Sequence, residues 1–248
     1  MFQADQNVWC IYFQSFSDKP LNKVFKRSEN FLNFAKSIFD SNDLSPTHHL
    51  ASHLDRKLGY REYSDKRLRN SIQSFSDRLM GIELANIAAA NDYHNWNLRV
   101  AEYENCDRSI SIMIQLKYVK PYHIDDYISK ISEMGPWDRG FAFKRRRSKA
   151  PEIFMLGTAF YSEKGLSKTE KNILEEWEIL PAGRKQKILR DLFPINIIDL
   201  EMKERVNKVY SDRELQIEEL SHSLFKFPIS KANKRPISKK LKEAGLLL

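Results

Sequence analysis

A run of positive charge is the chemical feature that stands out in this sequence. Residues 144–149 hold five cations, and Pro151 follows them. Short apolar runs flank the cations, residues 140–143 on one side and residues 153–161 on the other. Two apolar runs joined by a polar turn with a proline are typical of a β-hairpin. The pattern therefore predicts an exposed hairpin tip whose guanidinium and ammonium groups attract phosphate groups.

The composition of the whole chain favours the same kind of partner. The 248 residues include 41 Lys and Arg against 33 Asp and Glu, which gives a net charge of +8. Such a balance indicates polyanions, either phosphate backbones or anionic lipid headgroups. Hydrophobic residues make up 42% of the chain, an ordinary value for a folded protein. We therefore expect a folded protein that binds nucleic acid, DNA or RNA.

Two aromatic residues precede the cations on what the sequence predicts to be a strand. Phe141 and Phe143 are two apart, so they share one face of that strand. Residues 139–143 resemble the start of the RNP1 signature of RNA-recognition motifs, in which the aromatics stack on bases. The resemblance stops at Lys144, where the signature has an apolar residue, and at Arg146, where it has an aromatic one. The alternative is that this face belongs to the core.

A second group of residues has the order found in some metal-dependent enzymes. Asp107 followed by Gln115-Leu116-Lys117 resembles the D…(E/Q)xK layout of the restriction-endonuclease-like nucleases. In that chemistry carboxylates hold Mg²⁺ while a lysine polarises the attacking water or the phosphate. The resemblance implies catalytic roles for Asp107, Gln115 and Lys117, with Glu102 or Glu104 as a second acid. Since Gln115 replaces the usual carboxylate, the Mg²⁺-dependent nuclease stays an alternative, and otherwise we expect no cofactor.

Histidine and cysteine residues offer little metal chemistry. His49 and His53 are four apart, which on a helix would place both imidazoles on one face. No acidic third ligand follows at a recognisable spacing, so we expect ordinary surface or capping histidines and no metal site. Two cysteines, Cys10 and Cys106, cannot form a disulfide framework or a cysteine zinc site.

The protein should be cytoplasmic and without a membrane partner. Buried, reduced thiols are the default for two isolated cysteines in such a compartment. The apolar run at residues 8–13 is too short for a signal peptide. No run approaches the roughly 20 apolar residues of a membrane span.

The elements that would position these residues show two periodicities. Residues 110–116 alternate between apolar and polar, which predicts a strand over 110–119, and further strands are expected at 8–13, 140–144 and 153–161. Helical spacing predicts helices near 21–39 and 60–90. The sequence thus predicts an α+β fold: a mixed or antiparallel central sheet, compatible with a ferredoxin-like arrangement, with N-terminal helices and a helical C-terminal region.

The C-terminal part carries clear helix-start signals. Ser167 with Glu170, and Ser211 with Glu214, have capping-box spacing and predict helices to about residues 180 and 227. A short basic helix over 184–193 would complete a helix-turn-helix layout, and another helix is expected over 197–210. From residue 228 the chain is rich in lysine and reads as a weakly structured tail. We expect an α+β domain at 1–165, a helical domain at 166–227 and a flexible tail at 228–248.

These observations lead to three hypotheses about function. The first is a non-catalytic nucleic-acid-binding subunit of a replication, mobile-element or defence complex, with other protein subunits as further partners. The second is the Mg²⁺-dependent nuclease, and the third is a protein-interaction module that binds an acidic partner. Under the first hypothesis the contacting residues are Arg139, Phe141, Phe143, Lys144, Arg145, Arg146, Arg147, Lys149, Arg184, Lys185, Lys187, Arg190, Lys239 and Lys240.

Overall fold

The chain forms two compact units. The computed structural model describes residues 6–16, 32–40, 44–53, 59–74, 79–88, 93–102, 108–157, 165–221 and 223–248. Unit 1 comprises residues 1–16 and 136–248, and unit 2 comprises residues 17–135. Both boundaries expected from the sequence, after residues 165 and 227, fall inside unit 1.

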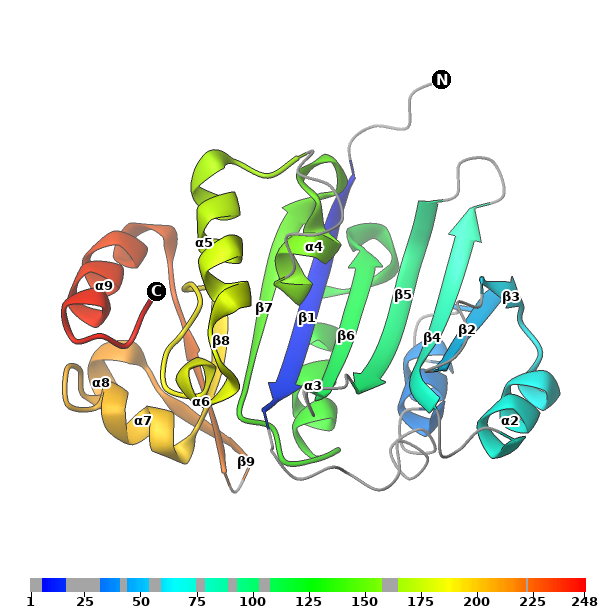
Figure 1. The fold of residues 1–248 in the computed structure, drawn as a ribbon, viewed down its shortest axis with the longest axis horizontal. Helices are drawn as coiled ribbons and strands as arrows, with labels where there is room; N and C mark the ends of the chain where they lie inside the picture. Colours follow the sequence, from blue (N-terminus) through cyan, green and yellow to red (C-terminus); the bar gives the residue numbers. More distant parts are fainter. Residues whose placement is uncertain are drawn as a thin grey trace. The chain divides into compact units, whose positions relative to one another are not determined.

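Unit 1 is built on an antiparallel sheet (Figure 1). Its strands are, in spatial order, β1 (Asn7–Ser15), β7 (Arg139–Arg146), β8 (Ile195–Asp199), β10 (Leu224–Pro228) and β9 (Glu218–Ser221). The longest ladder pairs β1 with β7, from Asn7 opposite Arg146 to Gln14 opposite Arg139. Gly140 permits this close approach, because a Cβ atom there would lie 2.7 Å from the carbonyl oxygen of Tyr12.

Unit 1 also contains helices of three to 13 residues. They are η2 (Arg147–Lys149), α4 (Pro151–Leu156), α5 (Lys168–Ile179), α6 (Ala182–Lys185), α7 (Leu200–Val206), α8 (Asp212–Leu215) and α9 (Lys231–Glu243). Both predicted capping boxes are confirmed. Ser167 and Glu170 exchange hydrogen bonds at the start of α5, and Ser211 and Glu214 do so at the start of α8.

The strands of unit 2 are also antiparallel. Its strands are, in spatial order, β3 (Arg61–Glu62), β2 (His48–His53), β4 (Leu79–Ala88), β5 (Tyr93–Glu102) and β6 (Arg108–Gln115). The helices of this unit are residues 32–40, α2 (Asp65–Ser74), η1 (Leu116–Tyr118) and α3 (Pro121–Ser132). Phe39 of the first helix packs on Trp96 of β5, with ring centroids 4.8 Å apart, so this helix helps to close the core.

The α+β class and the antiparallel sheet are confirmed, whereas the ferredoxin-like detail and an N-terminal group of helices are not. Strands were expected at the positions of β1, β6 and β7, and they form there. The long helix expected over 60–90 is wrong: among the described residues of this range only α2 is helical, and β4 follows it in the chain. The apolar residues spaced by three and four belong to two elements, since Leu68 and Ile72 lie in α2 but Ile82 lies in β4. Cross-strand pairing decides the conformation of β4, which local periodicity cannot reveal.

The C-terminal half contains more strand than expected. Residues 153–156 form part of α4 rather than a hairpin strand, and residues 158–161 lie outside the described part. The helix expected over 197–210 is β8 followed by α7, and the one from 211 to 227 ends at Leu215 before β9 and β10. The helix-start signal at Ser211 is real, but strand pairing decides the conformation of the residues that follow the short helix.

The segment after residue 228 is not a flexible tail. It forms α9, whose Ile237 and Leu241 are buried in one apolar cluster with Leu246 and Leu247. The N–H of Leu189 donates to the carbonyl oxygen of Leu246 at 2.8 Å, which ties the end of the chain to unit 1. Apolar residues spaced by four on an otherwise lysine-rich segment are enough to dock it.

We predict that Leu241→Ala destabilises the protein by about 2–5 kcal/mol, the usual cost of emptying a fully buried leucine site. Leu241 has no exposed surface. The neighbouring exposed Lys242→Ala is the control and should change the free energy of unfolding by no more than about 0.5 kcal/mol. Urea unfolding measures both variants, and equal midpoints for Leu241→Ala and the wild type would show that α9 does not contribute to the core.

Candidate functional site

The two aromatics of β7 lie in the interior of unit 1. Phe141 stacks on Phe193, with ring centroids 4.0 Å apart and an interplanar angle of 12°. Phe143 lies 5.3 Å from the same ring and packs edge-on against Phe154. Both residues of β7 are buried, so the alternative expectation, that this face belongs to the core, describes them. Their rings are not placed to stack on bases.

Arg139, the first residue of β7, is also buried. Its guanidinium carbon lies 4.6 Å from the ring centroid of Phe16 and 5.4 Å from that of Trp177. Its Nη atoms donate to the carbonyl oxygens of Lys185 and Ile188. Since Lys185 ends α6, Arg139 satisfies a carbonyl group that the short helix leaves unpaired.

Arg190 plays the same part for another short helix. Its Nη2 donates to the carbonyl oxygen of Phe154 at 2.5 Å, and Met155 accepts longer bonds of 3.5 Å. Both acceptors lie in the last turn of α4. The guanidinium also lies within 6 Å of the rings of Phe141, Phe154 and Phe193, at 5.2, 5.5 and 5.7 Å. A basic helix was expected over 184–193. Instead, Arg190 of this segment is buried and donates hydrogen bonds to the end of α4.

Both buried arginines stay cationic at neutral pH. Burial lowers the pKa of Arg139 to about 10, against the raising influence of Asp138 and Asp199. Burial also lowers the pKa of Arg190 to about 10. Because 10 is well above 7, each guanidinium keeps its proton, and unit 1 carries two positive charges inside.

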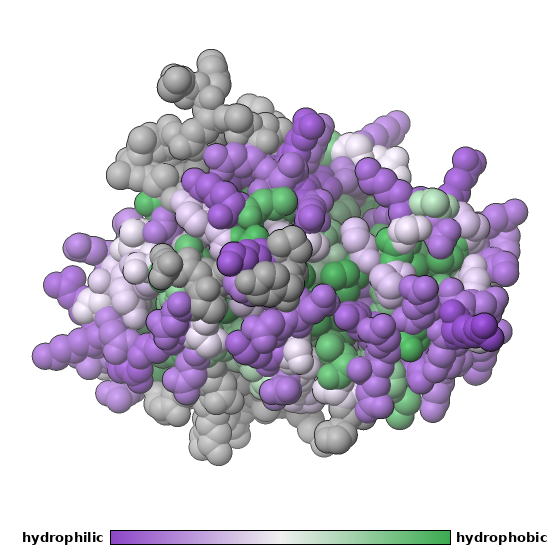
Figure 2. Space-filling view, turned by 180° about the vertical axis from the view of Figure 1, so that it is seen from behind, coloured by the Kyte–Doolittle hydropathy of each residue, from purple (hydrophilic) through white to green (hydrophobic). Residues whose placement is uncertain are grey.

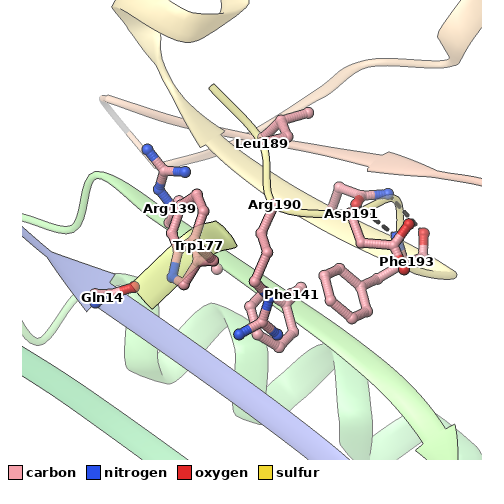
Figure 3. Close-up of a pocket in the computed structure, with 10 residues that line it drawn as sticks. Gln14, Arg139, Phe141, Trp177, Leu189, Arg190, Asp191 and Phe193 are labelled. Carbon is pink, nitrogen blue, oxygen red and sulfur yellow. Dashed lines mark hydrogen bonds between the residues drawn. The ribbon is translucent and has the colours of Figure 1, made fainter. Parts of the chain in front are cut away.

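A small cavity separates these side chains (Figure 3). In Figure 3 the side chain of Arg139 lies with Trp177, and that of Arg190 lies with Phe141. The cavity measures about 20 Å³, which suits one water-sized body and is far below the size of a small-molecule site. Its lining residues are Gln14, Arg139, Gly140, Phe141, Trp177, Leu189, Arg190, Asp191, Phe193 and Asn196.

The cation run that follows β7 is not a hairpin tip. The strand ends at Arg146, η2 follows, and α4 begins at Pro151. Lys144, Arg146 and Lys149 are exposed as expected. Lys144 nevertheless packs on a ring, with its Nζ 4.8 Å from the centroid of Trp9.

Arg145 and Arg147 contradict the expectation of an exposed cluster, because both are partly buried. The side chain of Arg145 is only 11% exposed and its Nη1 lies 2.7 Å from the carboxylate of Glu170. Its guanidinium also lies 4.2 Å from the ring centroid of Phe154. The ion pair therefore joins the end of β7 to the start of α5, which is a structural role.

The structure describes only part of the nuclease constellation. Asp107 lies outside the described residues, as does Glu104. Gln115 is the last residue of β6 and is buried, whereas Lys117 lies in η1 and is exposed, with its Nζ 4.6 Å from the ring of Tyr118. The two residues do not share a strand face, because the strand ends before Lys117. Within the described ranges, no group of three or more His, Cys, Asp or Glu could hold a metal ion.

The histidines lie on a strand and not on a helix. His49 and His53 are both in β2. Four residues along a strand span about 13 Å, so a strand does not bring the two positions together as a helix would. The His49 ring is buried, and burial lowers its pKa, so it is neutral at pH 7.

The helix-turn-helix layout does not form either: the first helix is present as α5, but in place of the second, expected over 184–193, there is only the four-residue α6. Arg184 and Lys187 are exposed beside it, while the Nζ of Lys185 lies 5.8 Å from the ring of Trp177. Lys239 and Lys240 are exposed on α9, and the Nζ of Lys240 lies 4.9 Å from the ring of Tyr210.

Sequence reasoning missed the most regular array of charge, which lies on α9. Four exposed cations follow one another at spacings of four, four and three residues and so share one side of the helix. We call Lys231, Arg235, Lys239 and Lys242 the α9 stripe. Lys239 lies 3.9 Å from Glu243, and the other three make no ion pair in the part of the chain that the structure describes. The missed signal was Ser230, whose side chain caps the helix by accepting the N–H of Asn233.

The positive charge of the chain is concentrated in unit 1. Of the 41 Lys and Arg, 24 fall in unit 1 together with 17 of the 33 Asp and Glu, which gives it a net charge of +7. Unit 2 has the remaining 17 cations and 16 acids, a net charge of +1. Hydrophilic side chains cover much of the described surface in Figure 2, and none of the described helices is long and apolar enough to cross a membrane.

Comparison with known proteins gives information about the fold and not about the function. No protein-family model and no curated protein matches the chain. A T6SS protein of Pseudomonas aeruginosa has a similar structure, with a TM-score of 0.60 over 98% of this chain and 73% of that chain, at 12% sequence identity. A chain from the structure of the toxic C-terminal tip of CdiA from Pseudomonas aeruginosa, in complex with an immune protein, reaches a TM-score of 0.29 at 14% identity, over 56% of this chain and 86% of that chain. The second likeness is too low to carry an argument, and the first shows a shared fold.

We predict that Glu170→Gln lowers the free energy of unfolding at pH 7 by about 1–3 kcal/mol, the worth of a hydrogen bond to a charged group. Glutamine keeps the capping box of α5 but loses the charge that pairs with Arg145. The matched control is Glu214→Gln, which changes the same box on α8, where none of the arginines that the structure describes pairs with the carboxylate. The control should have the smaller effect in chemical denaturation.

The effect of Glu170→Gln should depend on pH. Burial raises the pKa of Glu170, but the hydrogen bonds from Arg145 and Ser167 outweigh it and hold the pKa below its usual value. A carboxyl group whose pKa is lowered by folding stabilises the protein above the unfolded value, about 4.3. The difference between wild type and variant should therefore shrink as the pH falls through the folded pKa. A difference that stays constant down to pH 3 would show that the ion pair is not its source.

Proposed function

We propose that this chain is a non-catalytic binding protein, and that unit 1 recognises an acidic surface of a protein partner through the α9 stripe. The stripe is the observation that carries the proposal. It places four cations along one side of a helix, and three of them are unpaired within the described ranges. Cations that are exposed and unpaired keep their full attraction for a partner.

The stripe is held on a rigid element. Ile237 and Leu241 anchor α9 in the core of unit 1, so the cations are presented at the spacing of a helix and not by a flexible tail. Because α9 is already ordered before a partner binds, binding costs less conformational entropy than it would with a disordered lysine-rich segment. Electrostatic complementarity of this kind gives specificity and a high association rate.

Two features of unit 1 favour a protein over a nucleic acid as the partner. The aromatics of β7 are buried, which leaves them unavailable for stacking on bases. Unit 1 also exposes many carboxylates, which would repel a phosphate backbone but suit a protein surface of mixed charge. The exposed acids are Glu175, Glu176, Glu201, Glu204, Glu214, Glu218, Glu219 and Glu243.

Nucleic-acid binding remains the second candidate, supported by the net charge of +7 on unit 1. With the aromatics in the core, it takes the form of contacts to phosphates alone, from exposed residues such as Lys149, Arg184 and Lys187 and from the α9 stripe. Such binding would be independent of sequence and steeply dependent on salt.

We predict that the triple variant Lys231→Ala/Arg235→Ala/Lys242→Ala loses at least tenfold in affinity for an acidic probe. The measurement is fluorescence anisotropy with labelled polyglutamate and, separately, with duplex DNA of the same charge, each over a salt series. The matched control removes three other exposed cations of unit 1, Lys168→Ala/Lys208→Ala/Arg213→Ala, and should keep wild-type affinity.

The two probes distinguish the candidates. Binding of polyglutamate that depends on the stripe supports the protein partner. Binding of duplex DNA alone, with a salt slope that falls by about 0.9 for each phosphate contact removed, supports the nucleic acid. If neither probe binds, or if the control variant loses as much affinity as the stripe variant, the α9 stripe is not a binding surface.

A further inference from the structure

A proline interrupts the hydrogen bonding of α9. Pro236 lies beyond the first turn of this helix and is exposed. It has no N–H group to donate to the carbonyl oxygen four residues earlier, and its ring crowds that carbonyl. A proline at such a position weakens a helix, and positions that break a local rule are expected where a protein has a functional site. The carbonyl group that Pro236 leaves without its helical donor is therefore a candidate contact for a partner.

This group is the carbonyl of Ala232. In a helix each carbonyl points along the axis toward the N–H of the residue four positions further on, which here is Pro236. Ala232 and Pro236 are both exposed, so the carbonyl oxygen lies on the outer side of α9. The side chains of both residues are short, which lets another backbone come close. The outer side of α9 thus offers a hydrogen-bond acceptor.

The acceptor borders the α9 stripe. Ala232 directly follows Lys231 in the sequence, and Pro236 directly follows Arg235. At 3.6 residues per turn, each of the two lies next to a stripe residue around the helix. Ile237 is buried and holds the opposite side of the helix in the core. A partner that covers the stripe therefore also covers the acceptor, and it binds best if it brings both carboxylates and an N–H donor.

Three kinds of partner would bring negative charge to the stripe, and they differ in their backbone donors. A phosphodiester backbone has no N–H group. A helix uses its backbone N–H groups internally, except in its first turn. An extended chain has a free N–H group at every residue other than proline, unless it is paired in a sheet. Of these three, the extended chain alone offers a backbone donor along its whole length.

The spacing of the cations also fits an extended chain. Lys231, Arg235 and Lys239 follow one another at four residues of helix, about 6 Å along the axis. In an extended chain the side chains on one face recur every two residues, about 6.6 Å apart. Over two steps the mismatch is only about 1 Å, which long lysine and arginine side chains can absorb. Acids at alternate positions of an extended segment therefore match the three cations.

We infer that the partner presents an extended segment with Asp or Glu at every second residue, and that a backbone N–H group of this segment donates to the carbonyl oxygen of Ala232. The inference rests on the function proposed above and specifies the form of the acidic surface. The carboxylates bind the α9 stripe, while the backbone fills the place of the N–H that Pro236 lacks.

The first test compares two labelled peptides of equal length and charge by fluorescence anisotropy with the full chain. One alternates Glu with Thr, a residue that favours extended structure, and the other carries Glu at every fourth position of an alanine-rich helix. The alternating peptide should bind at least fivefold more tightly. Equal affinities, or tighter binding of the helical peptide, would overturn the inference and leave the proposed function standing. If neither peptide binds, both are overturned.

The second test removes the acceptor without removing any charge. Pro236→Ala restores an N–H group for the Ala232 carbonyl and favours the helix, so the variant should fold and melt at a higher temperature. Its affinity for the alternating peptide should fall about fivefold, the worth of one hydrogen bond. The control Asn233→Ala also favours the helix at an exposed position of α9 and should keep wild-type affinity. An unchanged affinity in Pro236→Ala would refute the contact to Ala232.

Discussion

Buried arginines at the ends of short helices are the constraint on which unit 1 depends. α6 has four residues and α4 has six, so neither helix can satisfy more than a few of its own carbonyl groups. Arg139 supplies donors to the first and Arg190 to the second. Gly157, in the left-handed region at φ 75°, ends α4 and leaves the space that the Arg190 guanidinium fills, since a Cβ atom there would collide with Nη1.

These contacts explain why the interior of unit 1 combines cations with aromatic rings. A guanidinium group that donates to carbonyl oxygens still needs surroundings that tolerate its charge. The faces of Phe16 and Trp177 serve Arg139, and those of Phe141 and Phe193 serve Arg190. Arg139 and Phe141 of the RGFAF stretch therefore both have partners from elsewhere in the core, Phe16 and Trp177 for the arginine and Arg190 for the phenylalanine. A pattern that resembles base recognition arises from the packing of a protein core.

The success of sequence reasoning followed the range of the interactions involved. Ser167 with Glu170 and Ser211 with Glu214 start helices through contacts three residues apart, so their spacing alone predicted them. The strands β1, β6 and β7 were also predictable, because their apolar residues dominate a short window. β4, β8 and β10 were not predicted, since their conformation is set by pairing with other strands, which a short window of sequence does not show.

In the candidate site, too, the sequence alone does not predict which single residues are buried. Arg145, Arg146 and Arg147 are identical in the sequence, yet Glu170 draws the first of them into a partly buried ion pair while the second is exposed. The two residues point to opposite faces of β7, and the acid that pairs with Arg145 lies in α5, which is distant in the chain. Neither the buried role of Arg190 nor the docking of Leu241 could be inferred from a lysine- and arginine-rich composition.

The distinction between inner and outer cations bears directly on function. Arg139 and Arg190 are committed to the helices and the cavity, so they add to the net charge of unit 1 without being available to a macromolecular partner. The α9 stripe differs because the helix separates its two sides: Ile237 and Leu241 face the core while the stripe faces outward. Four residues of helix advance by about 6 Å, which sets the spacing of Lys231, Arg235 and Lys239. A partner that fits this surface must present acids at a matching spacing, and this geometric demand, more than the net charge, would make recognition selective.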